Sequence, residues 1–193
     1  MKSDIKKIKK SMEKSLDTKR FEHTMGVAYT ACSLAMCYDI DLTKAQIAGM
    51  LHDCAKCLND EKKIEICQKH QMPIRDIEYK NPHLLHAKAG RCLAESKFHI
   101  KDTDILNAIE NHTTGRPDMS VLEKIIYIAD YIEPCREQAP DLAIVRKMAF
   151  RDLDQTLLKI LSDTLNYLSA AGKEIDPMTL QTYKYILKQT KNS

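Results

Sequence analysis

The sequence predicts an all-α protein, a helical array folded as a single domain over residues 1–193. Three observations favour this class. Apolar residues recur with the 3.6-residue period of a helix along almost the whole chain, and no segment of useful length has the two-residue alternation of a strand. Only five glycines and six prolines interrupt the 193 residues. Without tryptophan, and with only three phenylalanines, the core must come mainly from small and aliphatic side chains, which suit helix packing.

The first elements follow from capping residues. A first amphipathic helix is expected over residues 3–16, and a second begins near Asp17 or Thr18. Thr43 and Gln46 have the spacing of a capping box, so they predict the start of a third helix. That helix carries a long apolar run toward the middle of the chain.

The central elements are marked in the same way. Asn59 is expected to cap a helix that reaches about residue 70, and Asp102 a shorter helix that reaches about residue 112. Between them, Asn81 stands before Pro82, which predicts an N-cap followed by proline at the first helical position.

The last third begins with a second capping box. Ser120 and Glu123 precede an apolar run that ends at or just before Pro134. Three further helices are expected at about 141–150, at 151–170 with a stop near Gly172, and from Asp176 onward.

Charge and hydropathy exclude several classes of protein. The net charge is only +3, and the lysines within residues 2–10 are interpreted as the solvated face of the first helix rather than a nucleic-acid-binding arm. The N-terminus lacks the apolar run of a secretory signal, and no segment approaches the ~18–20 apolar residues of a membrane span. Seven cysteines are expected to be reduced. We therefore expect a cytoplasmic protein that binds neither nucleic acid nor membrane.

An ionisable pair, His52-Asp53, interrupts the apolar run of the third predicted helix. Placing such a pair inside an apolar helix is costly unless the pair has partners, and a bound cation would supply one. The alternative is a polar pair at a helix end.

Four more polar residues stand at comparable places, and each has a plainer interpretation. His23 and His86 lie on apolar helices, His112 stands where a helix ends, and Asp130 interrupts an apolar run. Taken singly, a histidine is more often a surface or satisfied core residue, and an aspartate can be exposed or hydrogen-bonded. Taken together with His52-Asp53, four imidazoles and two carboxylates suit transition metals and are about right for two ions that share a bridging carboxylate.

The order His23, His52-Asp53, Asp130 resembles the signature of the HD-domain superfamily of metal-dependent phosphohydrolases. Longer tracts resemble its YqeK-type branch, bacterial hydrolases that cut diadenosine tetraphosphate symmetrically into two ADP. The similarity runs over about residues 15–185. The tracts are Gly-Met-Leu-His-Asp-Cys-Ala-Lys (49–56), His-Leu-Leu-His (83–86), Asn-His-Thr-Thr-Gly-Arg (111–116) and Ile-Ala-Asp-Tyr-Ile-Glu-Pro-Cys-Arg (128–136).

The resemblance implies a fold, a cofactor and a set of ligands. The fold would be an HD-type helical array. The cofactor would be two divalent or mixed-valence transition-metal ions, iron first, with manganese, cobalt and nickel as alternatives. One ion would be held by His23, His52, Asp53 and Asp130, and Asp53 would bridge to a second ion completed by His86 and His112.

The expected substrate is a dinucleoside polyphosphate, attacked by a hydroxide that bridges the two ions. Two cations lower the pKa of a bridging water enough to make hydroxide available near neutral pH. Asp53 and Lys56 are the predicted catalytic residues. Substrate contacts are predicted for Lys56, Thr113, Thr114, Arg116 and Arg136. An ion pair with Glu133 is the alternative role of Arg136, and a solvated loop position that of Arg116.

Other functions stay open. An HD-type hydrolase could instead act on a nucleoside monophosphate, a cyclic nucleotide or a guanosine alarmone. A hypothesis from another class is that the chain is a non-catalytic nucleotide-binding regulator. The His-Thr-Thr-Gly and Ile-Glu-Pro-Cys-Arg tracts favour the tetraphosphate, and the complete set of candidate ligands argues against a degenerate regulator. The sequence leaves the oligomeric state open, with a homodimer as one alternative.

Overall fold

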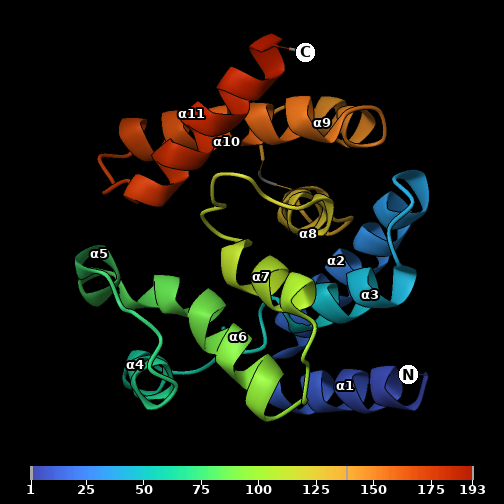
Figure 1. The fold of residues 1–193 in the computed structure, drawn as a ribbon, viewed down its shortest axis with the longest axis vertical. Helices are drawn as coiled ribbons and strands as arrows, with labels where there is room; N and C mark the ends of the chain where they lie inside the picture. Colours follow the sequence, from blue (N-terminus) through green and yellow to red (C-terminus); the bar gives the residue numbers. More distant parts are fainter. Residues whose placement is uncertain (1, 138, 193) are drawn as a thin grey trace.

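The computed structural model describes residues 2–137 and 139–192, and within these ranges it consists of helices and their connections (Figure 1). The predicted all-α class is confirmed. The α-helices are α1 (Lys2–Ser15), α2 (Thr18–Cys37), α3 (Leu42–Leu51), α4 (Asp60–Lys69), α5 (Asp76–Lys80), α6 (His86–Ser96), α7 (Thr103–Asn111), α8 (Val121–Ile132), α9 (Leu142–Ala149), α10 (Leu153–Ala170) and α11 (Pro177–Asn192), and a 3₁₀ helix, η1 (Pro82–Leu85), lies between α5 and α6.

Several predicted caps are confirmed. The side chains of Asp17, Asn59 and Asp102 accept hydrogen bonds from backbone N–H groups in the first turns of α2, α4 and α7. Ser120 and Glu123 form the predicted capping box at the start of α8. These caps satisfy donors that would otherwise lack a partner in the first turn of each helix.

One predicted helix start is wrong, and a second is confirmed in position but not in helix type. α3 begins at Leu42, because the Asp41 carboxylate accepts from the N–H groups of Thr43 and Lys44 and so caps the helix two residues before the expected capping box. Asn81 does occupy the N-cap position before Pro82 at the start of the next helix, but its amide donates back to the Ile77 carbonyl and makes no cap hydrogen bond. The segment that begins at Pro82 is 3₁₀ helix, and α6 starts only at residue 86.

A third correction concerns the ionisable pair. The sequence places His52-Asp53 inside an apolar helix, but α3 ends at Leu51 and His52 is its C-cap. Asp53 stands in the turn that follows. Both side chains are nevertheless almost fully buried, because the end of α3 is itself enclosed by neighbouring helices.

The core forms around α8, which Figure 1 shows nearly end-on between α2 and α3 on one side and the α9–α10 pair on the other. Leu122, Ile125, Ile126 and Ile128 of this helix are fully buried. A smaller apolar cluster ties α4 and η1 to α6. None of the helices in the described ranges combines the length and the apolar character that crossing a bilayer requires.

Candidate metal centre

Four histidine side chains converge on the carboxylate of Asp53. The Nε2 atoms of His86 and His112 lie 3.3 and 3.5 Å from Asp53 Oδ1. The Nε2 atoms of His23 and His52 lie 3.9 and 3.6 Å from the other oxygen, Oδ2. Each oxygen of one carboxylate therefore faces its own pair of imidazoles.

Three of these histidines occupy the same local position, the residue that caps the C-terminal end of a helix. His52 caps α3, His86 caps η1 and His112 caps α7. The last carbonyls of a helix lack backbone donors, so a ring at the C-cap can donate Nδ1–H back to the carbonyl three residues earlier. The acceptors are the carbonyls of Gly49, His83 and Ile109, at 2.7, 2.6 and 2.7 Å respectively. This leaves the Nε2 lone pairs directed at Asp53, which is the tautomer that binds metal.

His23 is oriented differently. It lies within α2, and its Nδ1 is 3.1 Å from the Glu133 carboxylate, while its Nε2 is 3.1 Å from Oδ1 of Asp130. Burial favours the neutral ring, but the hydrogen bonds with Asp130 and Glu133 raise its pKa. A metal ion at Nε2 would take the place of the proton shared with Asp130.

The cluster is electrostatically suited to a cation. Burial lowers the pKa of His52 to about 4 and that of His86 to about 3, so both rings are neutral near pH 7. Burial alone would raise the pKa of Asp53, but the electrostatic influence of neighbouring His52 and Lys56 holds it well below its usual range. The neutral rings of His52 and His86 and the ionised carboxylate of Asp53 are in the protonation states that metal binding needs.

Polar atoms at the centre lack protein partners in the described part of the chain. His52 Nε2 and Asp53 Oδ1 are buried with no hydrogen bond. The Nε2 atoms of His86 and His112 stand 3.2 Å apart, although both rings are already oriented as Nδ1 donors. Buried, unpartnered acceptors are costly, and a cation would satisfy them. Two sets of ligand atoms have their members within 4.8 Å of one another: His23, His52 and Asp130, and His52, Asp53 and His112.

Two of the predicted substrate-contact residues lie against the cluster. Lys56 Nζ is 3.1 Å from His86 Nε2 and 3.9 Å from Asp53 Oδ1. Burial lowers the pKa of this lysine. The Thr113 hydroxyl lies 3.3 Å from the Nε2 atoms of both His86 and His112. Both side chains can therefore reach a ligand bound at the centre.

Arg136 lies at the edge of the cluster and contacts one of its carboxylates. Its Nη2 donates to Asp130 Oδ1 at 2.9 Å. The alternative ion pair with Glu133 is not formed by its side chain, because the Glu133 carboxylate is engaged with His23 and with the N–H of Cys135. Arg136 therefore stands where it can meet both a metal ligand and an incoming anion.

The other two predicted contact residues are engaged elsewhere. Arg116 forms two 2.7 Å hydrogen bonds with the buried carboxylate of Glu123, so it is neither a free anion ligand nor a solvated loop residue. The Thr114 hydroxyl donates to the carbonyl of Gly115. The structure does not bring either side chain to the cluster.

Two functional contacts were not predicted. Arg20 Nη1 donates to Asp53 Oδ2 at 2.8 Å, and Glu133 accepts a hydrogen bond from Nδ1 of His23. Arg20 stands three residues before His23 on α2, which puts both side chains on the same face of the helix. That spacing could have indicated the role of Arg20 from the sequence. His23 and Glu133 are 110 residues apart, and no comparable local signal indicates their contact.

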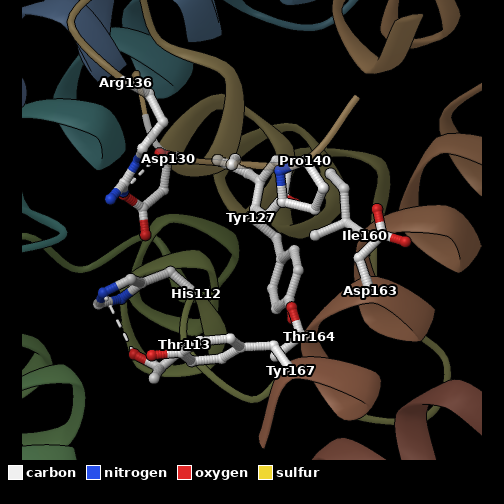
Figure 2. A pocket seen from close by; sticks show the side chains of 12 residues that line it. His112, Thr113, Tyr127, Asp130, Arg136, Pro140, Ile160, Asp163, Thr164 and Tyr167 are labelled. Atoms are coloured by element: carbon white, nitrogen blue, oxygen red, sulfur yellow. Dashed lines mark hydrogen bonds and ion pairs between the residues drawn. The ribbon is translucent and has the colours of Figure 1, made fainter. Parts of the chain in front are cut away.

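A cavity of about 380 Å³ opens beside the cluster. Figure 2 shows His112, Asp130 and Arg136 on one side of it and Tyr127 and Ile160 on the other. A second cavity, of about 520 Å³, adjoins the first and shares Thr113 and Thr164 with it. The first cavity thus places an apolar, aromatic wall opposite the candidate metal ligands, an arrangement that suits a base or a sugar attached to an anionic group.

The helical fold and the buried histidine–aspartate cluster identify the class of protein to which the chain belongs. The HD domain family matches residues 20–135, a range that contains all six candidate ligands, and the chain belongs to this family. Its fold is also that of a crystal structure described as a predicted HD superfamily hydrolase involved in NAD metabolism from Clostridium acetobutylicum. The TM-score is 0.92 and the identity 45%, over 95% of this chain and 97% of the other.

Two named relatives are similar to the chain. The symmetrical bis(5'-nucleosyl)-tetraphosphatase of Bacillus subtilis is 39% identical over 91% of this chain and 94% of its own length. The protein of the same name from Halalkalibacterium halodurans is 41% identical over 89% and 91%. The likeness to these proteins extends beyond the HD motif to nearly the whole of both chains.

Proposed function

We propose that this chain is a metal-dependent hydrolase that cleaves diadenosine tetraphosphate symmetrically into two ADP. The observation that carries the proposal is the convergence of four histidines on Asp53 in a chain that is about 40% identical, nearly end to end, to symmetrical bis(5'-nucleosyl)-tetraphosphatases. A buried cluster of this composition has no evident structural purpose without a cation.

His23, His52, Asp53 and Asp130 would hold one ion, and Asp53, His86 and His112 a second. Asp53 suits the shared position because its two oxygens face different histidine pairs. Imidazole and carboxylate ligands favour iron, with manganese, cobalt and nickel as alternatives. When bound, two such ions lower the pKa of a water and offset the charge of the phosphates.

The protein's own cations neutralise the substrate. Lys56 and Arg136 contact opposite parts of the ligand cluster, so a phosphate chain that crosses it meets a positive side chain on either flank. The Thr113 hydroxyl can donate to a phosphate oxygen. The departing ADP is a stable anion, so stabilising charge matters more than a strong general acid.

The cavities suit a substrate with two nucleosides. The cavity lined by Tyr127, Ile160 and Tyr167 can hold one nucleoside against an apolar wall. The adjoining cavity begins at the shared residue Thr113, so it continues the same surface past the cluster. A phosphate chain centred near Thr113 would place its middle bond at the cluster and its two ends in separate cavities, which favours symmetric cleavage.

The test combines metal analysis with product analysis. Protein purified without air is assayed for iron, manganese, cobalt and nickel, and then incubated with diadenosine tetraphosphate. ADP as the sole nucleotide product is expected. AMP together with ATP would contradict symmetric cleavage. Faster turnover of a nucleoside monophosphate or a guanosine alarmone under the same conditions would contradict the substrate assignment.

A further inference from the structure

Glu133 is a buried acid whose two carboxylate oxygens are both engaged. It stands at the C-terminal end of α8, and only 2% of its surface is exposed. Oε1 lies 3.1 Å from His23 Nδ1, and Oε2 accepts the N–H of Cys135 at 2.7 Å. The carboxylate therefore has one fixed orientation, and its ring-facing oxygen cannot turn away without losing both contacts.

The reason His23 needs this partner lies in its position on its helix. The other three histidines cap helix ends, where free carbonyls accept their Nδ1–H groups. His23 lies in the first third of the 20-residue helix α2, where the carbonyls already accept N–H groups from the next turn. An acceptor for its Nδ1 must therefore come from another element, and α8 supplies it.

Gly26 leaves the space that this contact requires. It lies three residues after His23 on α2, so it shares the face that turns toward Glu133. A Cβ atom at this position would clash with Glu133 Oε2. Any larger residue here would displace the carboxylate, so the sequence of α2 provides both the ring and the room for its acceptor.

We propose that Glu133 is a positioning residue, set in place by Gly26, that holds the His23 ring and thereby selectively strengthens the metal position formed by His23, His52 and Asp130. This inference rests on the metal centre of the proposed function. Glu133 touches no atom of the second position, whose histidines are oriented by backbone carbonyls. The two ions are therefore held unequally.

The physical basis is the partner of the ligand ring. A carboxylate acceptor makes a shorter, stronger hydrogen bond than a neutral carbonyl and increases the basicity of the coordinating nitrogen. Loss of such an outer partner typically weakens metal affinity about 10–100-fold. Because three of the four rings use carbonyls, removing Glu133 should affect one ion and leave the other in place.

Cobalt titration tests the proposal without relying on catalysis. Metal-free protein is titrated with Co²⁺, and bound ions are counted by equilibrium dialysis while the visible Co²⁺ absorption is recorded. We expect two ions per chain in the unchanged protein. In Glu133→Gln, one ion should bind about 10–100-fold more weakly and its absorption should shift, while the affinity of the other stays the same. Glu137→Gln is the matched control, since it removes the same charge from an exposed residue only four positions along the chain.

Gly26→Ala provides a second variant with the carboxylate left chemically intact. The added methyl group crowds Glu133, so the same single ion should be weakened. The unaffected ion serves as an internal measure of correct folding. Unchanged binding of both ions in Glu133→Gln, or equal weakening of both, overturns the proposal. Failure of the unchanged protein to bind Co²⁺ at all would instead overturn the metal centre and the proposed function with it.

Discussion

At the scale of the residue, Asp53 organises the centre. Its oxygens divide the four histidines into two pairs, and Arg20 donates to one of these oxygens. A carboxylate in this position is held ionised by its neighbours in spite of burial. No other side chain of the cluster faces every histidine, so its loss should not be compensated by a neighbour.

Replacing Asp53 by alanine is therefore expected to abolish both metal binding and hydrolysis. Loss of the ions removes several kcal/mol of charge stabilisation, so kcat should fall by at least ~10³-fold. Metal content by mass spectrometry and ADP release are measured on the same preparation. Asp76→Ala, at an exposed position at the start of α5, serves as the control. Full activity in Asp53→Ala would contradict the mechanism.

Lys56 separates substrate binding from metal binding. It contacts His86 and Asp53, but its ammonium group cannot coordinate a cation. We expect Lys56→Gln to retain two ions while kcat/KM for diadenosine tetraphosphate falls about 10²-fold, comparable to loss of one charge-stabilising donor. Lys62→Gln, at an exposed position paired with Glu65, controls for the loss of one positive charge. Loss of metal in Lys56→Gln would assign this lysine a role in building the centre instead.

The sequence predicted the residues that the structure brings together, but not everything that orients them. His23, His52 and His86 stood out because each interrupts an apolar pattern, and His112 because it stands where a predicted helix ends; both signals can be seen locally. Arg20 and Glu133 lie on helices where charged residues are common, and their importance comes from contacts across 33 and 110 residues. Contacts between residues so far apart in the sequence depend on how the helices pack, and a local sequence pattern does not reveal that packing.

At the scale of the element, the helices present their ends to the centre. A histidine caps the C-terminal end of each of three helices, α3, η1 and α7. The free carbonyls in the last turn of each helix accept a hydrogen bond from the ring and so fix its orientation. Helix starts were predicted at Asn59, Asp102 and Ser120 because a capping side chain acts on its own first turn. Helix ends were predicted less well, since α3 stops at residue 51 without glycine or proline to mark the place. The five-residue helix α5 was missed because it is too short to show a period.

The position of α3 depends on a close approach to α2 at Gly49. A Cβ atom there would lie 2.7 Å from Ala28 Cα and 3.1 Å from its nitrogen, backbone atoms that cannot move aside. We expect Gly49→Ala to lower the free energy of unfolding by about 1–3 kcal/mol through overpacking. Gly90→Ala is the matched control on α6, where the nearest atom is 3.4 Å away and the change should be neutral or stabilising by up to about 1 kcal/mol. Urea denaturation measures both, and equal stability of the two variants would contradict the close packing of α2 and α3.

At the scale of the whole molecule, the centre joins helices that are distant in sequence. Its ligands come from α2, the end of α3, the start of α6, the end of α7 and α8. α8 also forms the middle of the main apolar core, so the site and the core share a helix. Ions bound there would connect five elements at the point where the apolar core gives way to polar side chains. Metal binding should then stabilise the entire fold rather than one loop.

Removal of the metal is accordingly expected to lower the melting temperature of the protein. An ion that binds only the folded state adds about 4 kcal/mol when its free concentration is ~1,000 times Kd. For a chain of this size, each kcal/mol changes Tm by roughly 2–4 °C, so chelation should lower Tm by roughly 8–16 °C. Calorimetry before chelation, after it and after return of Mn²⁺ measures the effect, and return of the ion should restore Tm. Asp53→Ala should show no response to chelator or Mn²⁺. An unchanged Tm in the normal protein after complete metal loss would place the ions on the surface and not at the junction of these helices.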